Sequence, residues 1–281
     1  MRGQRTLAVA ALALGAAPGL ALGADNGAEE TTESPWRIGI AFGYGQRTNP
    51  LIQSDDITVL VDIDIAWFGE RWFFDNGDVG RTLHDGERFT LNVIGRFNSD
   101  RIFFSKTDTE YVSLFSSAGF VSTDEALLSA PQPIEVPDRD YAFEVGLELL
   151  SDGDWGFLQA AVHHDASDKH GGSELYVNYG RSFRRQRWFV EPSVGVSWKS
   201  ADLNDYYWGV RPHEASIWLP EYRAGAGANV EARIAASYQI DRHWAFHAAA
   251  QYERLSSEAA ASPLVEERSV KSGFAGFSFR F

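Results

Sequence analysis

The chain has 281 residues, with 25 basic and 39 acidic side chains and a formal charge of −14, which argues against a phosphate-binding surface and against DNA or RNA as a partner. It contains no cysteine, so disulfides, thiolate metal sites and cysteine nucleophiles are excluded. Apolar residues make up 44% of the chain but are interspersed with polar ones, which argues against both disorder and a bundle of transmembrane helices.

The N-terminal residues 1–23 have the features of a cleaved Sec-type signal peptide. Two arginines precede an uncharged run, and the small residues Ala21 and Gly23 fit a cleavage site. The alternative, a transmembrane helix, is disfavoured because the run contains proline and glycine and is short for a bilayer. Residues 24–35 are polar, acidic and aperiodic, which predicts a disordered periplasmic lead-in before a domain over residues 36–281.

From Trp36 onward the dominant pattern has a period of two, which places successive side chains on opposite faces of a β-strand. In residues 57–67, Ile57, Val59 and the other odd positions form an apolar face opposite Asp62 and Asp64. Repeated along the chain, this pattern predicts strands at 36–46, 56–67, 70–75, 79–84, 88–98, 140–150, 155–164, 173–183, 188–199, 223–240, 244–255 and 269–281.

Two places in this pattern depart from regular, full-length strands. The hairpin around Asn76–Gly77 is the weakest pair, and ten strands result in place of twelve if it does not span the membrane. Pro192 falls inside a strand, where it has no N–H for the ladder, so a β-bulge is expected there.

Three features favour a membrane barrel over a water-soluble sandwich. Aromatic residues gather at the ends of the apolar stripes, as in interfacial belts. Short connections such as 184–187 and 241–243 alternate with long ones such as 200–221 and 256–268, which is the asymmetry between periplasmic turns and external loops. The chain ends with Phe277, Phe279 and Phe281 on one face, an ending typical of substrates of the barrel assembly machinery.

The sequence therefore predicts an all-β fold, an antiparallel up-and-down transmembrane β-barrel in the outer membrane with lipid around it. Closure is required because an open sheet edge in hydrocarbon leaves backbone groups without hydrogen bonds. The charges predicted to face the lumen are Asp62, Asp64, Arg96, Glu144, Glu148, Glu174, Glu191, Lys199, Glu231, Arg233, Glu253 and Arg280. An open lumen with this acidic excess predicts a modest cation preference; the alternative is an interior closed by paired charges.

The densest group of polar side chains is His163, His164, Asp165, Asp168 and His170. The two adjacent histidines face opposite sides of a strand, so a shared metal is disfavoured and a loop closed by Asx-type turns is favoured. Ser167 with His164 and Asp165 offers the residue types of a hydrolase, but adjacency supplies neither an oxyanion hole nor an oriented base. We therefore predict no catalytic, metal-binding or cofactor-binding residues.

Aromatic residues also gather in the long connection 200–221, at Tyr206, Tyr207, Trp208 and Trp218. Three roles fit them: stacking on sugar rings, anchoring at the membrane surface, or packing within the loop. The sequence favours the last two roles over the first.

Several segments together resemble the MipA/OmpV family of outer-membrane proteins. They are DRDYAFEVGLEL (138–149), GDWGFLQAAVHHDASDKHGG (153–172), YYWGVRPHEA (206–215) with Pro220 and Tyr222 after it, WFGERWFFDNGDVG (67–80) and the C-terminal residues. The resemblance runs from about Trp36 to Phe281, and residues 100–137 match nothing in it.

This resemblance implies a non-catalytic envelope protein that links a murein synthase or hydrolase to the outer membrane, as one family member is described to do. The contact expected at the periplasmic side is the basic turn with Arg184, Arg185 and Arg187, whose charges suit peptidoglycan carboxylates or an acidic partner. The alternative interpretation of this turn is a solvated surface. The alternative functions are a narrow, mildly cation-preferring pore for small solutes and a lipid-modifying barrel enzyme.

Overall fold

The computed structural model describes residues 35–104, 134 and 136–279. The expected signal peptide (1–23), the lead-in up to residue 34, Arg280 and Phe281 lie outside the described residues. None of the helices within these ranges is long and apolar enough to cross a membrane.

The described residues form thirteen strands, two short α-helices and one 3-10 helix. They are β1 (Trp36–Arg47), β2 (Ile57–Phe68), β3 (Trp72–Asp75), β4 (Asp78–Asp85), β5 (Thr90–Phe97), η1 (Ser99–Phe104), β6 (Phe143–Gly153), β7 (Gly156–Asp165), β8 (Ser173–Gly180), β9 (Phe183–Arg185), β10 (Trp188–Lys199), α1 (Ala201–Trp208), β11 (Gly227–Gln239), β12 (Trp244–Arg254), α2 (Ser257–Ala260) and β13 (Ser269–Phe279).

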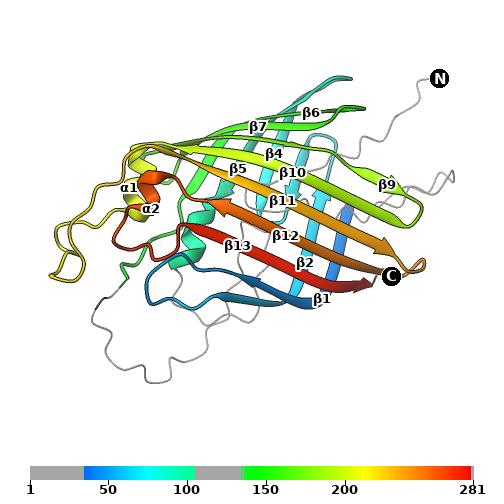
Figure 1. Ribbon diagram of the computed structural model, residues 1–281. Helices are drawn as coiled ribbons and strands as arrows, with labels where there is room; N and C mark the ends of the chain where they lie inside the picture. Colours follow the sequence, from blue (N-terminus) through cyan, green and yellow to red (C-terminus); the bar gives the residue numbers. More distant parts are fainter. Residues whose placement is uncertain (1–34, 105–133, 135, 280–281) are drawn as a thin grey trace.

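All strand pairs are antiparallel, and the sheet closes on itself. Each strand pairs with its neighbours along the chain, and β1 pairs with β13 to complete the ring. Strands β8 and β9 both pair with β10 and occupy a single position in the ring. The predicted fold class is therefore confirmed as a closed antiparallel β-barrel of twelve strands (Figure 1).

The hairpin β3–β4 belongs to this ring, so twelve strands and not ten are present. Its turn has positive φ at both central residues, 49° at Asn76 and 103° at Gly77, the backbone of a type I′ turn. Strand β3 is only four residues long and pairs with the last part of β2, from Ala66 to Phe68. The hairpin is thus shorter than the other strand pairs of the barrel.

The bulge expected at Pro192 is wrong. The register between β10 and β11 runs without a shift through Pro192↔Ile234. The carbonyl of Pro192 accepts from the N–H of Arg181, so its missing N–H also faces that side. There the ladder is interrupted between Gly180 and Phe183. The proline therefore divides the neighbouring strand into β8 and β9 and leaves its own strand regular.

The expectation that Ile57 and Val59 lie on the outward apolar face is also wrong. The pairing of β1 with β2 shifts register between Phe42 and Gly45. Beyond the shift, Val59 is 0% exposed and clusters with buried residues Ala235, Ala249 and Phe274 on β11, β12 and β13. Such contacts cross the barrel interior, so Val59 points into the lumen. The register shift therefore exchanges the inward and outward positions in the part of β2 beyond it.

The outward face of the barrel is apolar, as the alternation predicts. Ile38, Val194 and Val230 are more than half exposed, although each would be buried in a water-soluble protein. Pairs of aromatic rings lie near the short turns, with Trp188 and Tyr238 4.8 Å apart between centroids. This surface fits hydrocarbon with an aromatic belt at its edge.

The two ends of the barrel differ. Helices α1 and α2 and the long connections lie at one end, whereas the C-terminal end of β13 lies at the other end with the short turns (Figure 1). Because outer-membrane barrels have long loops outside the cell and short turns in the periplasm, we refer to these as the outer end and the periplasmic end.

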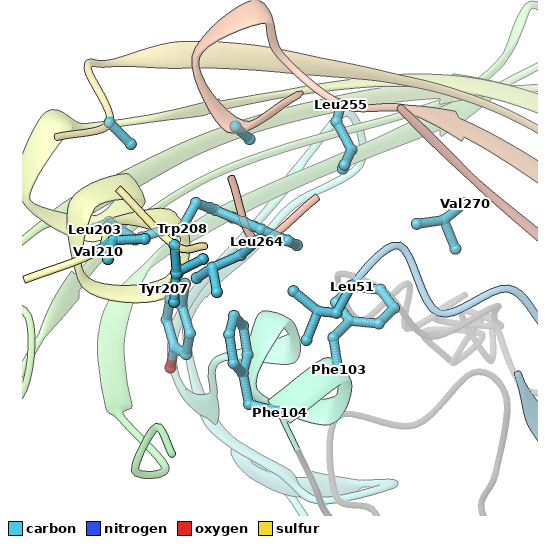
Figure 2. Packing of buried hydrophobic residues seen from close by; sticks show 13 residues of the cluster. Leu51, Phe103, Phe104, Leu203, Tyr207, Trp208, Val210, Leu255, Leu264 and Val270 are labelled. Atoms are coloured by element: carbon cyan, nitrogen blue, oxygen red, sulfur yellow. The ribbon is translucent and has the colours of Figure 1, made fainter. Parts of the chain in front are cut away.

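Four long connections build a hydrophobic cluster at the outer end, which we call the outer cap (Figure 2). Its buried members are Leu51, Phe103, Phe104, Leu203, Tyr207, Trp208, Val210, Leu219, Ala224, Leu255, Ala259, Leu264 and Val270. Two backbone bridges, Leu51↔Val265 and Val210↔Tyr222, tie the loops further. The outer end is therefore covered by a folded core of its own.

The aromatic residues of connection 200–221 divide between two environments. Tyr207 and Trp208 are fully buried in the outer cap, where Trp208 packs against Phe103 and Phe104 with centroids 6.1 and 5.7 Å apart. Trp218 is exposed. Packing within the loop therefore explains the role of Tyr207 and Trp208.

Candidate functional site

Two of the segments that carry the family resemblance, 138–149 and 206–215, meet at the outer end, around Arg139. The guanidinium of Arg139 donates to both carboxylate oxygens of Glu214, at 2.7 and 3.1 Å, and to the carbonyl of Gly209 at 2.9 Å. Arg139 is buried, and the paired geometry suits a planar guanidinium. Since Glu214 lies in the β10–β11 connection and Arg139 lies four residues before the start of β6, the ion pair fastens the outer cap to the barrel wall.

Glu214 lies outside the membrane-spanning strands, and its carboxyl is held in the charged form. Burial alone would raise its pKa, but the hydrogen bonds from the Arg139 side chain and from the N–H of Arg211, at 2.9 Å, outweigh burial. The pKa of Glu214 is therefore below its ordinary value.

We expect the outer cap to loosen in acid. Because the pKa of Glu214 is lower in the folded than in the unfolded state, its contribution is fully present above the ordinary value and is lost as pH falls through the folded pKa. Cleavage of the outer loops by an acid-active protease, normalised to an unfolded substrate, should accelerate as the pH falls below the ordinary glutamate value of 4.5. Glu214→Gln should already be cleaved fast at about pH 5, with a flatter profile. An unchanged pH profile in this variant would contradict the assignment.

The loop after β7 is organised by the carboxylate of Asp165. Its Oδ1 accepts from the N–H and the hydroxyl of Ser167, at 2.8 and 2.7 Å. Its Oδ2 accepts from the N–H groups of Lys169, His170 and Gly171, at 2.6, 2.7 and 2.9 Å. These contacts are of the Asx-turn type that the sequence favours for this loop, and they occupy both oxygens of the side chain.

The geometry does not assemble a Ser–His–Asp relay from the residues considered above. His163 is buried, whereas His164 is exposed on the opposite face, with its Nδ1 2.9 Å from the hydroxyl of Ser173. Ser167 and Asp165 bond to each other and not to His164. In the ranges that the structure describes, no three His, Asp or Glu side chains are arranged to hold a metal ion.

Below the outer cap, a group of buried charges crosses the lumen. Arg96 on β5 donates from Nε to Glu144 on β6 at 3.0 Å and also bonds Glu174 on β8. All three side chains are buried. Because β6 and β7 separate β5 from β8 in the ring, a contact between Arg96 and Glu174 must pass through the barrel interior.

Lys199 extends this group to the loop that follows β5. Its Nζ lies 2.7 and 2.6 Å from the two carboxylate oxygens of Asp100, and both side chains are buried. Asp100 belongs to η1, so the ion pair holds η1 against the inner face of β10. We call Arg96, Glu144, Glu174, Lys199 and Asp100 the charge network.

The other predicted lumen charges contact neutral donors or nearby charges. Asn92 and Gln159 donate to Glu148 at 2.9 and 2.7 Å, Ser182 donates to Glu191, Tyr176 and Gln251 donate to Glu231 at 2.6 and 2.8 Å, Asn229 donates to Glu253 at 2.8 Å, and Arg37 donates to Asp64 at 3.0 Å. Arg233 interacts electrostatically with Glu191, Glu231 and Asp62.

Sequence reasoning missed several charged residues of these groups, among them Arg37, Arg139 and Asp100. Arg37 contacts Asp64 and Asp75 at 3.0 and 3.4 Å, and its alternation with Trp36 was a signal that could have placed it in the lumen. Arg139 and Asp100 lie in irregular segments, where no periodicity indicates a direction. Only their contacts in the fold reveal their role.

The three arginines of the basic turn do not form one cluster. Arg184 pairs in register with Phe189, and its guanidinium lies 5.6 Å from that ring. Arg185 pairs with Trp188 on the outward face. Arg187 donates to the carbonyl of Ile240 in the adjacent turn at 3.0 Å. The turn thus presents charge in three directions.

Near the C-terminus, the aromatic residues lie on the outward face of β13. Phe277 packs against Phe246 with centroids 5.2 Å apart, and Phe279 against Trp244 at 5.0 Å. These rings continue the aromatic belt at the periplasmic end.

Comparison with known proteins finds several outer-membrane relatives. The chain is 30% identical over 129 residues to outer membrane protein Omp26La of Vibrio anguillarum, covering 46% of this chain and 50% of that protein. It is 27% identical over 145 residues to the MltA-interacting protein of Escherichia coli K12, covering 51% and 58%. Identity to outer membrane protein OmpV of Vibrio cholerae is 26% over 184 residues, covering 65% and 70%. The matched part thus spans about half the length of the first two relatives.

Among solved structures, the NanC porin aligns with 86% of this chain and 100% of its own, at 10% identity and a TM-score of 0.42. The likeness is too low to say anything about function. The relatives are named as outer-membrane or interacting proteins, and the protein is an outer-membrane β-barrel. The family model described as MltA-interacting protein MipA matches residues 38–281, nearly all of the barrel, and the chain therefore belongs to this family.

Proposed function

We propose that the protein is a non-catalytic structural scaffold of the envelope whose periplasmic end binds a murein-remodelling enzyme. The observation that carries the proposal is the filled upper lumen, where the buried and paired charge network lies below the outer cap. An interior packed in this way suits a rigid platform better than a path for solutes. The partner class comes from the relative named MltA-interacting protein.

The contact surface in this proposal combines two adjacent periplasmic turns. The N–H of Gln239 donates to the carbonyl of Arg187 at 2.9 Å, which joins the β9–β10 turn to the turn that holds Arg242. Arg184 and Arg187 add two further positive charges, and all three arginines are exposed. In an acidic chain, this local excess of arginine is complementary to carboxylates of a partner or of peptidoglycan.

Cross-linking in intact cells, followed by pull-down of murein enzymes, tests this surface. We expect the variant Arg184→Gln/Arg187→Gln/Arg242→Gln to capture roughly ten-fold less enzyme, at about 0.5 kcal/mol for each exposed charge. The matched control is Arg223→Gln/Arg268→Gln, which removes exposed arginines from the outer end. Equal capture by wild type and the triple variant would remove these arginines from the proposal, and no capture of any murein enzyme by wild type would end it.

The second candidate is a narrow pore with a mild cation preference. Asp62 and Asp64 favour it, because both are only partly buried on β2 and add to the acidic excess of the predicted lumen set. The outer cap and charge network would have to open for ions to pass. Planar-bilayer recordings separate the two functions, since a scaffold predicts no steady conductance and a pore predicts cation-selective steps.

Catalysis is not part of the proposal. The non-catalytic role in this proposal is supported by the bonds of Ser167 and Asp165 to each other and by the position of His164 on the opposite face. Lipid A analysis of cells that overproduce the protein should show no modification. The C-terminal set Phe277, Phe279 and Phe281 remains the proposed recognition signal for barrel assembly.

A further inference from the structure

Two arginines lie on the outward face of the barrel, where hydrocarbon and headgroups are the surroundings. Arg185 pairs in register with Trp188, which is 51% exposed and belongs to the aromatic belt. The backbone N–H of Arg181 donates to the carbonyl of Pro192. Pro192 shares the outward face of β10 with Val190 and Val194, so Arg181 lies opposite an outward position. Since residues two apart share a face, Arg181 and Arg185 both point out of the barrel, away from the lumen.

Both guanidiniums stand among exposed aromatic rings at the depth of a membrane interface. Phe183 lies between them in the chain, is 51% exposed, and carries the guanidinium of Arg181 over its ring at 5.5 Å. On the same face, Tyr179 stacks on Trp155 with centroids 6.1 Å apart, and its hydroxyl donates to the Trp155 carbonyl at 2.8 Å. Rings of this kind mark the boundary between hydrocarbon and headgroups.

The part of the chain that the structure describes supplies no ion-pair partner at this place. In the residues that the structure describes, neither Arg181 nor Arg185 forms an ion pair, whereas buried arginines such as Arg96 and Arg139 do. An arginine facing lipid is costly at the membrane centre and is tolerated near the interface, where its charge reaches phosphate groups. The missing anion is therefore expected from the membrane.

The break in the ladder at this position adds an acceptor. Pro192 has no N–H to donate to the carbonyl of Arg181, so this carbonyl lacks that ladder bond. A group with both a phosphate and hydroxyls can use the guanidiniums as donors and the carbonyl as acceptor. A glycerol headgroup has these features.

We propose that the outward face of β8 and β9 binds an anionic glycerophospholipid of the periplasmic leaflet, with Arg181 and Arg185 donating to its phosphate region and Phe183 packing on its acyl chains. This site is separate from the partner surface proposed above, which uses the arginines directed toward the lumen mouth and the neighbouring turn. Lipid binding at this site fixes the depth and the orientation of the periplasmic end in the leaflet.

Native mass spectrometry of the detergent-solubilised barrel, titrated with phosphatidylglycerol, tests the site. Each arginine near an anionic surface contributes about five-fold in binding, so Arg181→Gln/Arg185→Gln should bind about 25-fold more weakly. Phosphatidylcholine, which has a phosphate but no net charge, should bind wild type more weakly and lose less in the variant. Thermal unfolding of the variant should match wild type within about 0.5 kcal/mol, because neither side chain forms an ion pair among the described residues and the ring contact of Arg181 with Phe183 lies on the exposed surface.

Two further variants make the result decisive. Arg71→Gln/Arg88→Gln removes the same charge from other turns at the same end, beside Glu70 and Glu87, and should leave phosphatidylglycerol binding within about two-fold of wild type. Arg181→Lys/Arg185→Lys keeps the charge and should retain most of the binding. The proposal is overturned if the Gln variant binds as wild type does, if the control loses as much, or if lipid A and not phosphatidylglycerol shows the loss.

Discussion

An Arg96→Met variant is expected to lose about 3–5 kcal/mol of unfolding free energy, or to fail to assemble. Arg96 lies between Glu144 and Glu174, and all three side chains are buried. Removing the cation leaves two buried carboxylates facing each other, which costs more than any exposed charge pair contributes. Urea unfolding in lipid vesicles, followed by tryptophan fluorescence and by the heat-dependent gel shift of folded barrels, measures the loss.

The matched control is Arg254→Met, which removes an exposed arginine at the end of β12 and should change stability by less than about 0.5 kcal/mol. A rescue variant, Arg96→Met/Glu144→Gln/Glu174→Gln, neutralises the whole group and should recover most of the loss, since replacing a buried ion group entirely is often nearly neutral. If the rescue variant were as unstable as the single one, lost packing and not unpaired charge would explain the effect.

Trp208→Ala is expected to open the outer cap while leaving the barrel folded. Trp208 is 1% exposed, contacts Phe103 and Phe104, and its carbonyl accepts from the hydroxyl of Ser262 at 2.5 Å. Truncating a buried tryptophan costs about 3–5 kcal/mol, which is comparable to the stability of a small core. Limited proteolysis should therefore cut the outer loops at least ten-fold faster, while the gel shift of the barrel persists.

Trp218→Ala is the control, because this residue is in the same connection but is 65% exposed. It should be cut at the wild-type rate. The same two proteins should then be recorded in planar bilayers. Conductance in Trp208→Ala with a silent wild type would identify the cap as the barrier, whereas resistance of Trp208→Ala to protease would show that the four loops do not depend on one core.

Strand positions and the closed barrel could be predicted because they depend on local alternation. In β10, for example, Trp188, Val194 and Trp198 face outward while Glu191 and Lys199 face inward, with the boundaries that the sequence indicates. The requirement for hydrogen-bonded closure in hydrocarbon then selects the barrel.

The errors occur where a residue's environment depends on a neighbouring strand. Alternation along β2 predicts that Val59 faces outward, but the register shift between Phe42 and Gly45 of β1 places it in the lumen. Pro192 was expected to distort its own strand and instead interrupts the adjacent one between Gly180 and Phe183. Both effects depend on pairing, which a single strand does not encode.

The candidate site was predictable only in its components. Alternation indicates that Arg96, Glu144 and Glu174 share the lumen, but their contacts join residues 48 and 78 positions apart. Arg139 and Glu214, 75 positions apart, lie in loops without periodicity. Aromatic residues in a loop indicate neither burial nor exposure, as Trp208 and Trp218 illustrate.

By itself, the sequence determined which residues form strands, which face of most strands meets lipid, and that the ring must close, because side-chain direction along a strand and backbone hydrogen bonding are short-range properties. Only the tertiary structure decided which lumen charges neutralise one another, how four loops form the outer cap, and which arginines of the basic turn face the membrane. Those outcomes depend on the strand register around the ring and on the curvature that brings distant loops together, and both are set by the whole barrel.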